Sequence, residues 1–275
     1  MRVHHLSAAT LCPPFASSFR HEGRAEMVCH CLLVEAPDRL VLVDTGLGTA
    51  DLADPVGRLG WSFQTFTRPV LDPALTAVEQ IRRLGFAPED VRDIVLTHLD
   101  LDHAGGLSDF PHARAHVMMA EQEAAVLRTS LREKERYRKA HIDAWPCWSL
   151  YSPRGEPWFG FESVRNLQGL PPEILLVPLI GHTRGHAGVA VQGEGGWLLH
   201  AGDAYFHRDE LGGGKAPALL EGFQRLLAMD GKRRLENRAR LVELAKEHGS
   251  EVKVFCAHDP VELAAFGPAK PPAAA

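Results

Sequence analysis

Between Thr97 and Gly106 the chain reads THLDLDHAGG, which places two imidazoles and two carboxylates within six residues. This is more coordinating chemistry than a solvated loop usually carries, and imidazole nitrogen with carboxylate oxygen suits zinc, iron or manganese. The adjacent side chains of Asp102 and His103 leave the backbone in different directions. The loop can therefore offer His98 to one ion and Asp102 with His103 to another, which favours a site with two metal ions.

Three further apolar, strand-like runs each end in a short polar loop with a potential metal ligand. These ligands are His182, Asp203 and His258, after the runs 174–180, 197–200 and 252–256. Loops held on a rigid scaffold are where catalytic and binding residues usually lie. We therefore expect the four loops to converge on one point.

The ordered series of these motifs resembles that of the metallo-β-lactamase superfamily. The series consists of DTG at 44–46, HLDLDH at 98–103, GHTRGH at 181–186, Gly202-Asp203 and Ala257-His258. It spans residues ~28 to ~260, with order and spacing both fitting. The resemblance implies an α+β fold, a four-layer αβ/βα sandwich with the metals at one edge between two sheets. We expect one such domain over residues 1–266.

The resemblance also implies a ligand set. His98 and His182 would bind the first metal, Asp203 would bridge the two metals, and the second would take Asp102, His103 and His258. The family usually has histidine where this chain has Asp100, and the flavodiiron branch places a glutamate there. An aspartate at this position binds through a shifted geometry or through water, and carboxylates favour iron or manganese over zinc. We expect two divalent ions, with zinc first and iron or manganese as alternatives.

Such a site predicts a dinuclear hydrolase acting on a small molecule. Two close cations lower the pKa of a bridging water, and the hydroxide attacks the carbonyl of an ester or lactone while Asp102 or Asp203 handles the proton. Lactonases of the superfamily carry a tyrosine three residues after the bridging aspartate. Tyr205 follows by two, so it is a candidate oxyanion donor, with local packing as the alternative. The alternative functions are a diiron oxidoreductase or dioxygenase, favoured by Asp100, and a thioesterase of the glyoxalase II type.

Several residues near these motifs have structural interpretations. His186 is expected to support the site rather than to ligate a metal, and Asp44 either bonds to a metal ligand or forms a plain turn. Cys29 and Cys31 are interpreted as small buried residues. The five cysteines are an odd number at irregular spacing, which does not predict a disulfide framework.

Hydrophobic periodicity predicts the remaining elements. We expect hairpins over 28–43 and 189–200, strands over 91–97 and 112–119, and helices over 71–84, 121–138 and 235–248. The aromatic segment 141–169 is predicted to be a lid or pocket wall, with packing at a sheet edge or in a dimer as the alternative. A homodimer is therefore left open. The tail 267–275 is expected to be disordered.

The overall charge argues against a nucleic-acid partner, because the net charge is −5 and the pI is near 6.3. The basic run Arg132–Lys139 alternates with glutamates, which predicts a solvated helix face without a function. Residues 1–10 contain no apolar stretch long enough for a signal peptide or a membrane span. We expect no membrane association and a cytoplasmic location.

Overall fold

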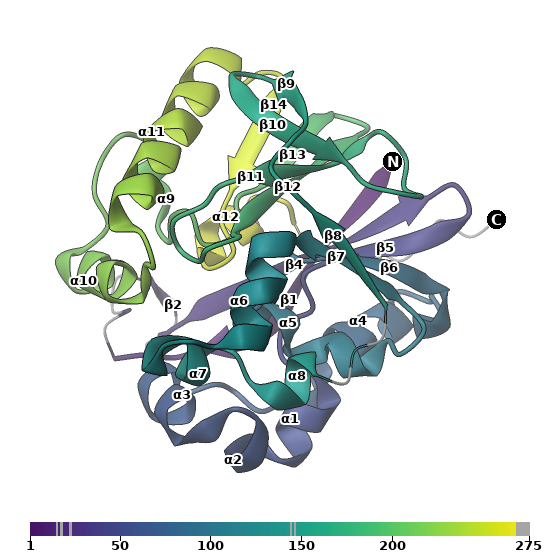
Figure 1. The fold of residues 1–275 in the computed structure, drawn as a ribbon, viewed down its shortest axis with the longest axis vertical. Helices are drawn as coiled ribbons and strands as arrows, with labels where there is room; N and C mark the ends of the chain where they lie inside the picture. The colour runs from purple at the N-terminus through teal and green to yellow at the C-terminus, as the bar shows by residue number, and fades with distance from the viewer. Residues whose placement is uncertain (15, 17–18, 22–23, 144, 146, 268–275) are drawn as a thin grey trace.

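Two six-stranded sheets lie face to face with helices on both outer sides, which gives a four-layer αβ/βα sandwich (Figure 1). The computed structural model describes residues 1–275 except 15, 17–18, 22–23, 144, 146 and 268–275. The first sheet has the order β1 (Arg2–Leu11), β4 (Met27–Ala36), β5 (Arg39–Val43), β6 (Val91–Val95), β7 (Arg114–Met118) and β8 (Trp148–Tyr151). The second has the order β14 (Val252–Phe255), β13 (Gly196–His200), β12 (Ala187–Gly193), β11 (Ile174–Pro178), β10 (Phe161–Asn166) and β9 (Glu156–Trp158). A short ribbon pairs β2 (Arg20–His21) with β3 (Arg24–Ala25).

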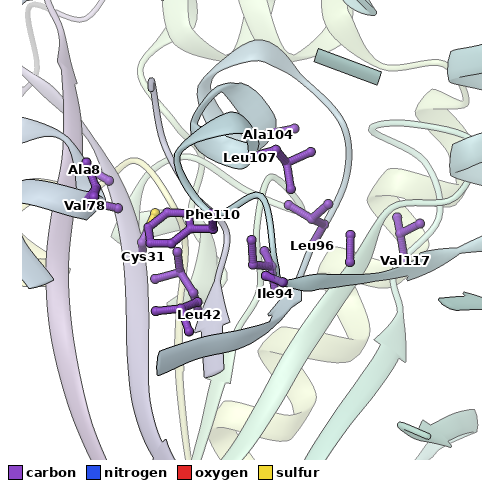
Figure 2. Packing of buried hydrophobic residues seen from close by; sticks show 14 of the residues in the cluster. Ala8, Cys31, Leu42, Val78, Ile94, Leu96, Ala104, Leu107, Phe110 and Val117 are labelled. Carbon is purple, nitrogen blue, oxygen red and sulfur yellow. The ribbon is translucent and has the colours of Figure 1, made fainter. Parts of the chain in front are cut away.

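The central strands bury both faces, because successive side chains of a strand point to opposite sides of the sheet. In β5, Leu42 joins a cluster with Val78 of the outer helix α4 (Ala77–Arg83), as Figure 2 shows. Its neighbours Val41 and Val43 join a second cluster, which includes Val189 of the other sheet. The alternation in β5 thus fixes one helix layer and the contact between the sheets.

The helices divide between the two outer faces. The first half of the chain contributes α1 (Thr49–Ala53), α2 (Pro55–Arg58), α3 (Gly60–Thr67), α4, α5 (Leu101–Ala104), α6 (Met119–Leu127), α7 (Leu131–Arg136) and α8 (Lys139–Ile142). The second half contributes α9 (Arg208–Leu211), α10 (Ala218–Leu227), α11 (Gly231–His248) and α12 (Pro260–Ala264), with α11 packed on β14. Among these described helices none combines the length and the apolar character needed to span a bilayer.

Both predicted hairpins are confirmed, since β4 pairs antiparallel with β5 and β12 with β13. The prediction of one helix over 121–138 is wrong. Arg128 adopts a left-handed conformation (φ 44°) and ends α6, and a capping box of Ser130 and Glu133 begins α7. The Ser130-x-x-Glu133 pattern is a sequence signal for this second start.

The described residues of the aromatic segment 141–169 continue the two sheets, which agrees with the alternative of packing at a sheet edge. β8 pairs with β7 at the edge of the first sheet, and β9 and β10 extend the second. Trp145 and Trp148 pack on the core around the first sheet, and Trp158 packs on the core of the second. The aromatic residues therefore serve packing at the sheet edges. Apart from Gly267, the predicted tail lies outside the described residues.

Candidate metal centre

The four polar loops converge because the strands before them end at one edge of the sandwich. β13 and β14 are parallel, so Asp203 and His258 follow their strands at the same edge. The loop after β6 meets the start of β12 in the facing sheet, where the Ala187 N–H donates to the Thr97 carbonyl over 2.9 Å. The expected convergence is thus a property of the strand topology.

A first group of possible ligand atoms comes from His98, Asp100, His182 and Asp203, all within 4.8 Å of one another. Asp100 Oδ2 lies 3.0 Å from His182 Nε2 and 3.4 Å from His98 Nε2. Asp203 Oδ2 lies 3.3 Å from His182 Nε2. Two imidazoles and two carboxylates therefore surround one point, and the carboxylate of Asp100 is one of the four groups.

A second group shares Asp203 with the first. Asp203 Oδ1 lies 3.2 Å from both His103 Nε2 and His258 Nε2. Asp102 Oδ2 is 3.7 Å from His258 Nε2. The thiol of Cys29, which the sequence analysis treats only as a buried residue, lies 3.9 Å from the same oxygen of Asp102. Asp203 Oδ2 lies 3.3 Å from His258 Nε2 as well as from His182 Nε2, so the carboxylate of Asp203 stands between the two groups.

Unpaired buried atoms show that these groups fit metal ions. His98 Nε2, His103 Nε2 and Asp203 Oδ1 are buried without a hydrogen-bond partner among the described residues. Buried polar atoms are nearly always paired, so three orphans at one point call for an additional partner. A divalent cation satisfies imidazole nitrogen and carboxylate oxygen together, and both donor types suit zinc, iron and manganese.

In two of the candidate ligands, His103 and His258, the Nδ1 atom contacts a protein oxygen. Their Nε2 atoms are thereby oriented towards Asp203. His258 Nδ1 donates to the Val28 carbonyl over 2.8 Å, and His103 Nδ1 lies 2.8 Å from Asp44 Oδ2. Asp44 also accepts from the backbone N–H and the hydroxyl of Thr97, at 2.8 and 2.7 Å. Asp44 adopts a left-handed conformation (φ 54°) to reach these partners. It therefore orients a candidate ligand and does more than form a turn.

His186 supports the backbone of Asp203 and does not belong to either group. Its Nδ1 donates to the Leu179 carbonyl over 3.0 Å, and its Nε2 accepts the Asp203 N–H over 2.9 Å. Burial holds the pKa of His186 well below its usual value, which keeps the ring neutral and able to accept. This is the supporting position that the sequence analysis expects.

Glu121 is a buried residue that the sequence analysis missed. One carboxylate oxygen accepts the Leu99 N–H over 3.1 Å, and the other accepts the Gly185 N–H over 2.9 Å. Gly185 packs so closely that an added Cβ would lie 2.3 Å from the Glu121 nitrogen. Glu121 thus joins the loop of His98 to the loop of His182. No motif marks it, because glutamates on helices are usually solvated.

Tyr205 is placed away from both groups. Its side chain is fully buried, and its hydroxyl donates to Glu262 over 3.0 Å. Burial and the nearby carboxylate raise the pKa of Tyr205 well above its usual value. Among the described residues that line the pocket beside the metal ligands, Tyr205 does not occur. The geometry therefore agrees with local packing and not with an oxyanion donor.

We expect Tyr205→Phe to lower the free energy of unfolding by about 1 kcal/mol, because one hydrogen bond is lost. The kcat of hydrolysis should stay unchanged, since the hydroxyl does not reach the pocket. Urea unfolding and steady-state kinetics check both parts. A loss of kcat of ~10²-fold, the usual effect of removing an oxyanion donor, would return Tyr205 to the reaction.

A pocket of about 470 Å³ opens beside the candidate ligands. The candidate ligands Asp100, Asp102, Asp203 and His258 line it, and its other charged or polar lining residues include Ser62, Arg132, Glu135 and Arg136. Its walls are mainly apolar and come from Leu11, Met27, Phe63, Phe66, Leu101, Phe206, Phe223, Leu226 and Leu227. The pocket can therefore hold a molecule whose reacting group lies at the carboxylates and whose remainder is apolar.

Comparison with known proteins agrees with this geometry. The family model of the metallo-beta-lactamase superfamily matches residues 24–240. A probable metallo-hydrolase of Mycobacterium tuberculosis is 44% identical over 261 residues, which cover 94% of this chain and 81% of that protein. An N-acyl homoserine lactonase of a Bacillus species is 28% identical over 211 residues, covering 75% of this chain and 74% of that protein.

Solved structures share the fold at lower sequence identity. An N-acyl homoserine lactone hydrolase with N-hexanoyl-L-homoserine bound at its catalytic metal centre aligns with a TM-score of 0.69 and 21% identity. The alignment covers 94% of each chain. This similarity shows that the two chains share the fold.

Proposed function

This chain belongs to the metallo-beta-lactamase superfamily and is a metal-dependent hydrolase, and we propose that it uses two metal ions to hydrolyse lactones or esters that carry an apolar chain. The observation that carries the proposal is the pair of ligand groups sharing Asp203 beside a pocket with mainly apolar walls. The Bacillus relative and the aligned structure, a lactonase and a lactone hydrolase by name, support the substrate class.

We assign the first ion to His98, Asp100, His182 and Asp203, and the second to Asp102, His103, His258 and Asp203. Zinc is the first choice, and a solved relative by fold is described as a dizinc lactonase. When bound, such ions supply Lewis-acid activation of a carbonyl and of water. The protein residues orient the ions, exclude bulk water and move the proton.

Of the two candidate catalytic carboxylates, Asp102 is better placed to move the proton. Both line the pocket, but the oxygens of Asp203 face three imidazoles at 3.2–3.3 Å. Asp102 is 9% exposed and lies at 3.7 Å or more from His258 and His103. In the reaction the oxygen of water bonds to the carbonyl carbon and the bond to the leaving oxygen breaks. Asp102 carries the proton from water to that oxygen.

A panel of lactones of increasing acyl length, aryl esters and thioesters tests the proposal. We expect metal-dependent opening of lactones or esters, with kcat/KM rising with chain length as the apolar walls are filled. Each buried methylene contributes about 0.8 kcal/mol. Cleavage of thioesters alone would instead identify a glyoxalase II type of thioesterase.

Phe66→Asp places a charge in the pocket wall, and Trp61→Asp is its matched control. Both residues lie on α3 and both are exposed, at 60% and 73%, but only Phe66 lines the pocket. We expect Phe66→Asp to lower kcat/KM for long-chain lactones by ~10-fold, the equivalent of about two buried methylenes. Short-chain substrates and the Trp61→Asp enzyme should be unaffected. An equal loss for all chain lengths would show that the chain binds elsewhere.

A diiron dioxygenase remains the second candidate, because Asp100 adds a carboxylate to the first group and carboxylates favour harder ions. Protein purified without added metal distinguishes the two functions. Iron with oxygen-dependent turnover and no hydrolysis of the panel would defeat the hydrolase proposal.

A further inference from the structure

Asp100 brings a negative charge to a position where the family usually has a neutral histidine. The first group then holds two carboxylates, Asp100 and Asp203, around one point. Aspartate in place of histidine makes the charge of the site more negative by one unit. In a buried site water screens this extra charge only weakly. A nearby compensating charge is therefore expected.

The compensating charge is Arg136, at the end of α7. Its Nε lies 3.3 Å from Asp100 Oδ1, which is an ion pair without a hydrogen bond, and the residue is only 8% exposed. The two oxygens of Asp100 are thereby divided: Oδ1 faces the guanidinium, and Oδ2 faces His98 and His182.

The same guanidinium also donates hydrogen bonds to two backbone carbonyls. One terminal nitrogen donates to the His182 carbonyl over 2.9 Å, and the other donates to the Leu227 carbonyl over 2.7 Å. Leu227 ends α10 and lines the pocket. Arg136 thus contacts two segments of the first ligand group and the pocket wall. The planar fork of arginine can make all three contacts at once, which a lysine ammonium cannot.

We propose that Arg136 is a positioning residue that makes Asp100 a metal ligand through Oδ2 alone and restores the charge that a histidine at position 100 would give. This inference rests on the proposed two-metal site. It predicts that position 100 and position 136 depend on each other. With histidine at position 100, the positive charge of Arg136 would lie beside the first ion without a carboxylate to neutralise it. With a neutral residue at position 136, the carboxylate of Asp100 would have no positive partner.

The test is a double-mutant cycle read by metal content. Wild type, Asp100→His, Arg136→Gln and the double variant are stripped with chelator, loaded with zinc and analysed by mass spectrometry, with folding checked by circular dichroism. We expect two ions in wild type and ~10- to 100-fold weaker binding of one ion in each single variant, the usual effect of losing a group that orients a ligand. In the double variant, binding should recover by at least about tenfold over Arg136→Gln.

Arg132→Gln is the matched control. Arg132 also lies on α7, lines the same pocket and donates to a carbonyl just after α10, that of Ala228, but no ion pair joins it to Asp100. We expect this variant to retain both ions. Loss of an ion from it would mean that any weakening of the contact between α7 and α10 empties the site.

Two outcomes would overturn the proposal. If the double variant binds no more tightly than Arg136→Gln, Arg136 acts only through the two carbonyls. If Arg136→Gln does not fold, Asp100→His alone decides, because unchanged binding of two ions by that variant would show that no counter-charge is required. A wild-type protein that holds no metal after loading would defeat the two-metal function as well. If the protein hydrolyses none of the lactones, the proposed substrate class is wrong, but the expected metal contents of the four proteins do not change.

Discussion

Replacing Asp203 with alanine should abolish hydrolysis and loosen both metal ions. Its carboxylate faces both ligand groups, with Oδ2 3.3 Å from His182 and Oδ1 3.2 Å from His103. Each ion therefore loses a ligand, and the three imidazoles lose the charge that draws them together. Since metal activation contributes several kcal/mol to transition-state stabilisation, we expect kcat/KM to fall by ~10³-fold or more.

Metal analysis and kinetics on a good substrate measure this effect. Asp209→Ala is a suitable control, because Asp209 is six positions along the chain and its side chain is 64% exposed. The control should retain activity and metal. Retained activity in Asp203→Ala would show that the bridging assignment is wrong.

The second large effect is expected from Glu121→Ala. The substitution removes the acceptor of two buried backbone N–H groups, those of Leu99 and Gly185, and of the Tyr137 hydroxyl. A buried donor left unpaired costs about 1–3 kcal/mol, so we expect a loss of roughly 3–5 kcal/mol in the free energy of unfolding. For a chain of this size that corresponds to a fall in Tm of about 10 °C.

The same substitution should weaken metal binding by ~10- to 100-fold, because the loops of His98 and His182 are no longer joined. Thermal unfolding and zinc titration measure the two effects. Glu123→Ala is the matched control, since Glu123 lies two positions along α6 and is exposed. Similar losses in both variants would mean that α6 is merely sensitive to change and that Glu121 has no special role.

Most of the β-sheet arrangement could be predicted from the sequence. The runs at 28–34, 40–43 and 91–97 are rich in valine, leucine and isoleucine and are mostly buried, so the local pattern alone predicts these strands. The candidate ligands could be predicted because each motif follows such a strand. Their convergence then follows from the order of strands that the family resemblance implies.

Residues whose roles depend on distant partners could not be predicted. The basic run at 132–139 predicts a solvated helix face, which is wrong for Arg136, since this side chain is buried against the carbonyls of His182 and Leu227, 46 and 91 positions away. Glu121 likewise depends on partners far along the chain, the N–H groups of Leu99 and Gly185. Helical periodicity shows that a face exists, but it does not show which segment covers that face.

Tyr205 illustrates a limit of motif matching. Its position differs by one from the tyrosine of the lactonase pattern, and in a tight loop one position redirects a side chain. Here the hydroxyl reaches Glu262, whose pKa burial raises to about 7. The pocket walls on α3 and α10 lie outside any motif, so their role emerged only from the structure.

An anomalous-difference map of zinc-loaded crystals, collected at the zinc edge, would locate the metal ions and show whether Asp203 bridges them. We expect two peaks, one within bonding distance of His98, Asp100 and His182 and the other within bonding distance of His103 and His258, with Asp203 bound to both. A single peak, or a second peak that Asp203 does not touch, would contradict the two-metal site bridged by Asp203.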